Sequence, residues 1–116
     1  MIRLRSQMKE ERCAECHEGK GELLLHALIN PGDSDHSLLF MHDDILPQGV
    51  SIGEHRHEGS EEVYFIVEGH GTLMMDRQSH PVGPGDVSLV KSGHSHGIVN
   101  TGETAMRLIV VGFRTT

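Results

Sequence analysis

Apolar residues in this chain come in short runs that are separated by turn-forming residues. The runs are rich in β-branched and aliphatic side chains, and Gly, Pro, Asn and Asp recur between them. Short strands at this kind of even spacing are typical of antiparallel sandwiches and barrels. The pattern predicts strands at residues 22–29, 37–46, 50–56, 62–68, 71–76, 87–91, 96–100 and 105–113.

The turns between these runs suggest how the strands connect. Residues 30–33 (Asn-Pro-Gly-Asp) and 81–86 (Pro-Val-Gly-Pro-Gly-Asp) are strong breakers, and residues 68–71 (Glu-Gly-His-Gly) predict a tight hairpin. We therefore expect most strands that are neighbours in sequence to pair in the sheet. Residues 62–67 are apolar at both odd and even positions. We expect one face of this strand to line the barrel interior and the other to meet a second sheet or subunit.

The 116 residues support one domain, which we divide into a lead, residues 1–20, and a compact body, residues 21–116. The lead is polar and predicts one helical turn around residues 6–11. No apolar run approaches the roughly 18 to 20 residues of a membrane span, and no apolar stretch follows the basic residues of the N-terminus. We expect a cytoplasmic protein with no membrane partner.

Charge and composition exclude other partners and point to one kind of site. The chain has 17 Asp and Glu against 10 Lys and Arg, a net charge of −7, which repels phosphate backbones. It has no Trp and only 3% aromatic residues, so it lacks stacking platforms for bases. We therefore expect no nucleic-acid partner. Ten histidines together with 14 glycines indicate a metal site on a β scaffold.

A first motif places three metal-binding side chains close together. It runs Gly49, five residues, His55, one residue, His57, four residues, Glu62, six residues, Gly69. His55 and His57 are two apart, so on a strand they project from the same face. Glu62 follows a short loop, which we expect to bring the strand of Glu62 beside the strand of His55 and His57. Glu61 is the nearest competitor, but only Glu62 has the six-residue step to Gly69.

A second motif supplies one more imidazole. It runs Gly85, seven residues, Gly93, two residues, His96, three residues, Asn100. His94 competes with His96, but only His96 has the three-residue step to Asn100. Three imidazoles and a carboxylate suit a borderline divalent metal, and a six-coordinate ion would keep two positions open. The plainer alternative is that His55 and His57 lie exposed on a loop beside a solvated acidic pair.

Together, the two motifs resemble the two-part signature of the cupin superfamily over about residues 37–113. The first motif matches throughout, and the second departs only where Lys91 stands in place of the usual Pro. The resemblance implies an all-β fold with a single RmlC-like jelly-roll barrel. It also implies structural roles for one asparagine and three glycines, which are Gly69, Gly85, Gly93 and Asn100.

By the same resemblance, one divalent transition metal per chain (Fe, Mn, Ni, Zn or Co) would be held by His55, His57, Glu62 and His96. Imidazole must be neutral to coordinate, so its reference pKa of about 6.5 predicts that metal affinity falls below about pH 6. Many cupins are dimers. The two apolar faces of residues 62–67 and the apolar Ile2 and Leu4 of the lead also favour a homodimer.

A fold of this kind does not fix a reaction. Our leading hypothesis is a metal-dependent enzyme, such as an oxygenase, isomerase or lyase, that acts on a small polar metabolite, either an organic acid or a sugar derivative. The catalytic residues are not assigned, and Tyr64 and His94 are the acid–base candidates. The alternative is a non-catalytic binding or sensory module. A protonatable side chain in the pocket favours the enzyme, and a purely apolar lining favours the module.

Cys13-Ala14-Glu15-Cys16-His17 matches the short pattern for attachment of haem c. Without a secretory signal we do not expect haem, and we favour unspecialised thiols over a two-cysteine zinc or redox site. A disulfide is not expected in a reducing compartment. Among the other histidines, His42 is of interest because its strand lines the barrel on one side.

Overall fold

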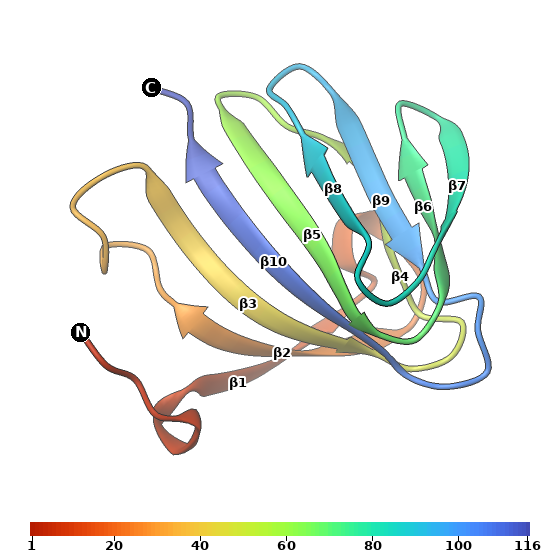
Figure 1. Cartoon of the computed structure of the whole chain (residues 1–116), viewed down its shortest axis with the longest axis horizontal. Coiled ribbons are helices and arrows are strands. Elements are labelled where there is room, and N and C mark those ends of the chain that lie inside the picture. Colours follow the sequence, from red (N-terminus) through yellow and green to blue (C-terminus); the bar gives the residue numbers. More distant parts are fainter.

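The computed structural model describes residues 1–116 and consists of two antiparallel β-sheets (Figure 1). Two short 3-10 helices, η1 (Arg5–Gln7) and η2 (Cys16–Glu18), flank the first strand. The ten strands are β1 (Lys9–Ala14), β2 (Glu22–Ile29), β3 (Leu38–Leu46), β4 (Ser51–Arg56), β5 (Ser60–Glu68), β6 (Gly71–Met75), β7 (Gln78–Val82), β8 (Val87–Val90), β9 (Ser95–Val99) and β10 (Met106–Arg114).

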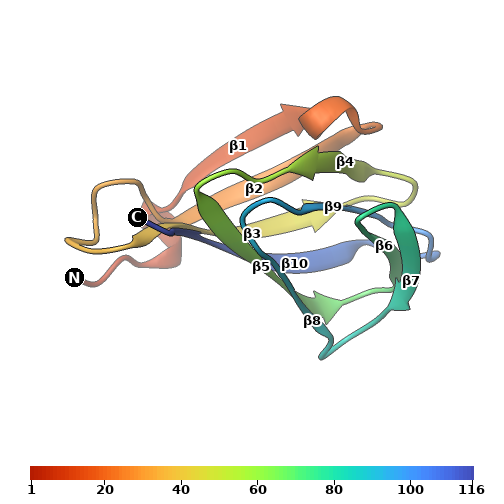
Figure 2. The same ribbon diagram turned by 90° about the horizontal axis from the view of Figure 1, so that it is seen from above.

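One sheet has six strands in the order β1-β2-β3-β10-β5-β8, and the other has four in the order β4-β9-β6-β7. Both termini lie at the end of the molecule away from β6 and β7 (Figure 2). This two-sheet arrangement confirms the predicted all-β jelly-roll class. No helix in the structure combines the length and the apolar character needed to cross a membrane.

All eight predicted strands are present, and each boundary lies within two residues of its expected place. The two missed strands, β1 and β7, are edge strands with almost no buried residue. Because nearly all side chains of these two strands meet solvent, their sequences carry no alternating apolar pattern. The helical turn predicted around residues 6–11 is wrong over Lys9–Glu11, because these residues belong to β1. The nearest helical residues are Arg5–Gln7 of η1.

The predicted strand pairing is wrong in most places. Residues 68–71 do not form a hairpin, because β5 pairs with β10 and β8 whereas β6 pairs with β7 and β9. Gly69, with φ of 84°, turns the chain from one sheet into the other. β4 and β5 also lie in different sheets. Only three pairs, β1–β2, β2–β3 and β6–β7, join strands that follow one another in sequence.

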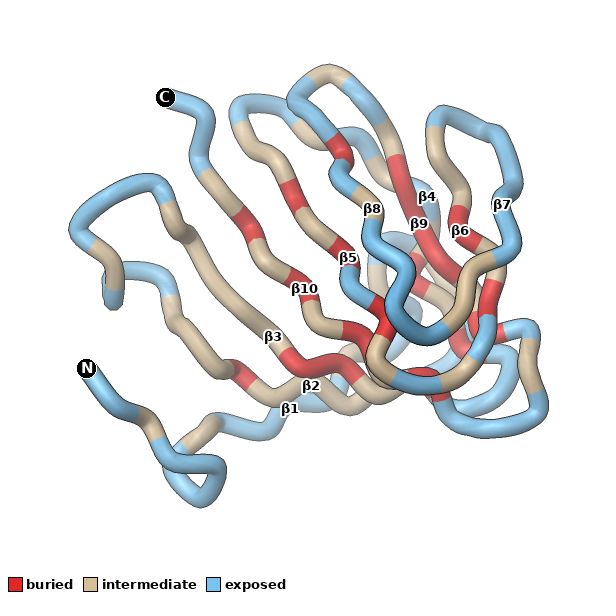
Figure 3. Tube along the Cα trace, viewed as in Figure 1, coloured by how far each residue is buried: buried red, intermediate tan, exposed pale blue.

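The core lies between the two sheets, where eleven buried side chains form one cluster. In Figure 3 the buried positions alternate along β5 and β10 and are concentrated in β9. On β5, Glu62, Tyr64 and Ile66 point inward, whereas Phe65 is 41% exposed on the outer face. Glu62 therefore shares the face of β5 that carries the core residues Tyr64 and Ile66.

The first residues of the chain are tied to the six-stranded sheet. β1 pairs with β2 along its whole length. Upstream, the Arg5 guanidinium donates to the buried Asp43 carboxylate at 2.9 Å, and Arg3 bonds Asp33 and the carbonyl oxygen of Leu28. A division between a lead and a barrel at residue 20 remains a prediction.

Candidate metal centre

The fold brings the four sequence-predicted ligands together. Each of His55, His57, Glu62 and His96 offers one ligand atom, and these atoms all lie within 4.8 Å of one another. His55 is on β4, His57 follows directly after that strand, and His96 is on the neighbouring β9. Glu62 reaches them from β5 in the opposite sheet. The cluster therefore spans the two layers, and none of the four is exposed.

The distances between these atoms suit a bound cation. His96 Nε2 lies 3.2 Å from one Glu62 oxygen, His57 Nε2 lies 3.8 Å from the other, and the two Nε2 atoms are 3.0 Å apart. Ligands about 2.1 Å from one ion and at right angles to each other lie about 3 Å apart. A divalent transition ion therefore fits between these side chains.

Outer hydrogen bonds orient two of the imidazoles. His55 Nδ1 lies 2.7 Å from the carbonyl oxygen of Gly53, which can only accept, so Nδ1 carries the hydrogen and Nε2 keeps its lone pair. His57 Nδ1 lies 3.2 Å from the Ser60 hydroxyl, so its other ring nitrogen, Nε2, is the one that faces the cluster. Metal-binding histidines are commonly held by such a partner on the second nitrogen.

Burial sets the protonation of the cluster. It lowers the pKa of His55 and of His96 to about 4, and it lowers the pKa of His57 as well. It raises the pKa of Glu62, while the neighbouring histidines oppose that shift. Burial therefore favours the neutral imidazoles that a metal requires, and the fall of metal affinity below about pH 6 stays a prediction.

The competing residues lie elsewhere. Glu61 faces away from the core, opposite Phe113 on β10. His94 is exposed, and its Nδ1 pairs with Asp76 at 2.7 Å. Tyr64 is buried beside the cluster, with its ring stacked on His96 at a centroid distance of 4.1 Å. Of the two acid–base candidates, only Tyr64 is near the site.

A cavity of about 300 Å³ opens beside the four residues. His55 and Glu62 form part of its wall, and His42 lies on it as the sequence suggested. The sequence analysis missed Asp44, which also lines the cavity and is only 4% exposed. Asp44 has the same strand parity as His42 on β3, which is the signal that would have identified it.

Asp44 is an unusual carboxyl group. Its Oδ1 atom is buried without a hydrogen-bond partner. Burial, with the nearby charges of Glu62 and Asp43, raises its pKa to about 7. Asp43 next to it points to the outer face, where Arg107 makes two hydrogen bonds of 2.9 Å, and its pKa is lowered despite burial. Asp44 is thus a protonatable group on the cavity wall.

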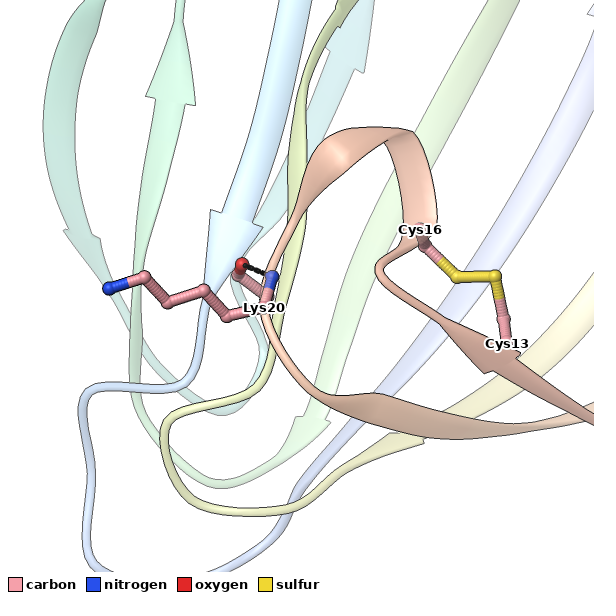
Figure 4. The surroundings of a disulfide bond; sticks show 4 residues. Cys13, Cys16 and Lys20 are labelled. Atoms are coloured by element: carbon pink, nitrogen blue, oxygen red, sulfur yellow. Dashed lines mark hydrogen bonds between the residues drawn. A yellow bond between two sulfur atoms is a disulfide. The ribbon is translucent and has the colours of Figure 1, made fainter.

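The structure joins Cys13 and Cys16 in a disulfide, so the expectation of two free thiols is wrong (Figure 4). The chain folds back between them because Glu15 takes a left-handed backbone conformation, with φ of 50°, and brings the two Cα atoms to 5.7 Å. His17 and Glu18 are left-handed as well. Both cysteines lie on the cavity wall.

This turn is held against β4, the strand that carries His55. The Lys20 amide donates to the Ser51 hydroxyl at 2.8 Å (Figure 4), and the Ser51 amide donates to the Lys20 carbonyl oxygen at 2.9 Å. The backbones approach so closely that a Cβ atom on Gly53 would overlap the carbonyl oxygen of His17. The disulfide-bonded turn and the metal centre are therefore in direct contact.

The chain belongs to the cupin family. Its residues 41–112 match the family model for the cupin domain. This agrees with the two motifs and with the jelly-roll fold.

Relatives with known names cover nearly the whole chain. It is 36% identical over 112 residues to an oxalate-binding protein of Thermotoga maritima, an alignment that covers 96% of this chain and 92% of that protein. It is similar to the crystal structure of a predicted oxalate decarboxylase from Thermotoga maritima, with a TM-score of 0.92, 32% identity and coverage of 98% and 99% of the two chains. It shares only the fold with KdgF from Halomonas sp., at 14% identity, a TM-score of 0.78 and coverage of 98% and 93%.

Proposed function

We propose that this cupin binds one divalent transition metal through His55, His57, Glu62 and His96 and uses it to hold a small organic acid inside the barrel. The observation that carries this proposal is the convergence of three imidazoles and one carboxylate beside a cavity whose wall includes His55 and Glu62. The oxalate-binding relative supports an organic acid over a sugar derivative as the ligand.

Different residues of the chain orient the metal ligands and exclude water from the site. Gly53 and Ser60 contact the Nδ1 atoms of His55 and His57 and so orient the two rings within the cluster. Apolar side chains around them exclude water, which strengthens every polar contact inside. When bound, the metal would supply a Lewis acid that polarises a carbon–oxygen bond of the ligand.

An enzyme is favoured over a binding module because the cavity is not purely apolar. Asp44 holds its proton up to about pH 7 and is therefore able to give or take one near neutral pH. Within the enzyme hypothesis, Asp44 replaces His94 as the acid–base candidate. A lyase acting on a carboxylic acid is the reaction class that agrees with the Thermotoga maritima neighbour.

The test is metal analysis of the purified protein, followed by metal titration of single variants. We expect about one transition ion per chain, and a loss of several orders of magnitude in metal affinity for His57→Ala or His96→Ala. Exposed His80→Ala is the matched control and should bind metal like the parent protein. Full occupancy in a variant lacking all three clustered histidines would refute the proposal.

A further inference from the structure

The cavity wall has few side chains that can donate a hydrogen bond to a ligand. No lysine or arginine lines the cavity, and its polar side chains are those of His17, His42, Asp44, His55, Glu62 and Tyr64. Asp44 and Glu62 carry carboxyl groups, and the Tyr64 hydroxyl is enclosed by protein. His55 belongs to the metal cluster. The free side-chain N–H donors for a bound acid are therefore those of His17 and His42.

His42 is the better placed of these two donors. His17 is exposed on the disulfide-bonded turn, where water competes for its hydrogen bonds, and His55 covers one face of its ring. His42 is partly buried on the inner side of β3, and its ring nitrogens make no hydrogen bond within the protein and are not enclosed. Burial lowers the pKa of His42, so its neutral ring offers one N–H donor near pH 7. A hydrogen bond made away from bulk water contributes more to affinity.

The strand register places His42 across the sheet from the metal cluster. Strand β10 lies between β3 and β5, and its Val110 pairs with His42 on one side and with Tyr64 on the other. Glu62 is two residues from Tyr64 on β5, so its side chain lies on the same inner face. Neighbouring strands are about 4.8 Å apart, which separates β3 from β5 by about 10 Å. A small acid therefore fits between the cluster and His42.

The ring of His42 is held by an aromatic neighbour. Phe40 stacks on it, with ring centroids 4.5 Å apart and planes 25° from parallel. Phe40 pairs with Gly112 of β10, and a Cβ atom at residue 112 would overlap the Phe40 ring. The Phe40 ring therefore lies over the backbone of Gly112, in space that only a glycine leaves free. This packing orients His42 before a ligand binds, which lowers the entropic cost of a contact.

We propose that His42 binds the organic acid directly: its ring N–H donates to a carboxylate oxygen that the metal does not hold, and Phe40, lying over Gly112, orients the ring. The inference rests on the proposed function, since the metal must hold the other end of the acid. The ligand class that it assigns is acids with oxygen atoms at both ends, such as small dicarboxylates. An acid with an apolar far end would leave the His42 donor without a partner.

Calorimetric binding of two probes to the zinc-loaded protein tests this contact. Oxalate has oxygens that extend beyond the metal, whereas acetohydroxamate chelates a metal through two oxygens and ends in a methyl group. His42→Phe keeps the aromatic pair with Phe40 but removes the donor. It should lower oxalate affinity at least tenfold, because a hydrogen bond to a charged oxygen contributes about that much, while acetohydroxamate and zinc bind within twofold of the parent. His42→Gln, whose amide donates, should recover part of the loss.

Two further variants test the support of the ring and the specificity of the effect. Gly112→Ala displaces the Phe40 ring and should lower oxalate affinity severalfold, with less than a twofold effect on acetohydroxamate. His80→Phe makes the same substitution as His42→Phe at an exposed position on β7 and should match the parent protein with both probes. Thermal unfolding establishes that each variant is folded.

The outcomes separate this inference from the proposed function. If the protein takes up no zinc, or if the loaded protein binds no oxalate, the proposed function fails and this inference fails with it. If the parent binds oxalate and His42→Phe binds it equally well, the function stands and the role of His42 is wrong. Equal losses of both probes in His42→Phe would also overturn the inference, because a contact to the far oxygen affects oxalate alone.

Discussion

The imidazole of His17 stacks on the ring of His55, with centroids 3.6 Å apart and planes 11° from parallel. His17 comes from the disulfide-bonded turn, and His55 is one of the four clustered residues. The turn contains three non-glycine residues in the left-handed region, each of which costs on the order of 1 kcal/mol. The Cys13–Cys16 bond, together with the contacts to β4, holds this conformation against that cost.

Reduction of the disulfide should therefore weaken metal binding. A dithiol reagent converts the Cys13–Cys16 bond to two thiols and is itself oxidised to a cyclic disulfide, a two-electron exchange. Without the crosslink the turn relaxes and His17 leaves His55. We expect about a tenfold lower metal affinity by competition with a chelator, because loss of an outer contact to a ligand typically has an effect of that size.

Two variants make this result specific. His17→Ala should lower metal affinity to a similar extent while the disulfide is intact. The double variant Cys13→Ser, Cys16→Ser should bind metal like the reduced parent and should not respond to the reagent. Equal affinities in the oxidised and reduced parent protein would show that the turn does not influence the metal centre.

Glu62 and its neighbour Glu61 form a matched pair for mutation. Glu62→Ala removes the one charged ligand and should lower metal affinity at least a hundredfold, because only its carboxylate faces the histidines. Glu62→Gln should be milder, since an amide oxygen still coordinates. Glu61→Ala should keep the metal content of the parent in elemental analysis. The reverse result would place the strand register off by one residue.

Asp44 gives the metal-free protein a distinctive pH dependence. Its pKa is about 7 in the folded chain against an ordinary value of 3.8. Between these values the folded protein keeps a proton that the unfolded chain releases, so this group's contribution to the free energy of unfolding falls as pH rises toward 7. Asp44→Asn removes that loss and should stabilise the protein at pH 8 by on the order of 4 kcal/mol relative to its effect near pH 4.

Urea unfolding of both proteins in the presence of a chelator measures this difference. The comparison with the parent is needed because His55 and His96, whose pKa values are lowered to about 4, give the opposite slope and lose stability as pH falls below about 6.5. Their contribution cancels between parent and variant. A stability difference that is the same at pH 4 and pH 8 would contradict the assignment.

The outer face of β5 and β8 predicts a homodimer. Phe65, Val87 and Leu89 are 41%, 67% and 46% exposed, and they lie together because Phe65 is opposite Val87 in the paired strands. A second copy of the chain would cover this apolar surface. Light scattering at tens of micromolar should give twice the chain mass of 12.8 kDa, and Val87→Asp should give the single mass. A parent protein at 12.8 kDa would rule out the dimer.

The sequence was sufficient to predict eight of the ten strands and the cluster of four residues. Strands such as β5 and β10 are buried on their inner face, so their apolar pattern marks them, and the six-residue step to Gly69 selected Glu62 over Glu61. The motif spacing then placed His96 with His55 and His57, although β4 and β5 turned out to lie in different sheets. The motif spacing and the alternation of side chains along each strand identified the cluster, although the predicted pairing of the strands was wrong.

Other features depend on information that local patterns lack. The polar edge strand β1 resembles a surface turn in sequence, and no residue type marks Glu15 as left-handed, so neither the strand nor the disulfide was predicted. Asp44 was missed because an aspartate next to another aspartate suggests a solvated surface. Only the three-dimensional structure shows that Asp43 meets arginines outside and Asp44 faces the cavity.

The position of β10 has a consequence for how the protein is made. This last strand lies in the middle of the larger sheet, between β3 and β5, and contributes Met106, Leu108 and Val110 to the core. While a ribosome is still holding these residues, β3 and β5 have no strand between them and their inner faces stay open to water. The barrel therefore closes only after synthesis of residues 106–114, and a chain that stalls shortly before this point exposes two unpaired strand edges to other nascent chains.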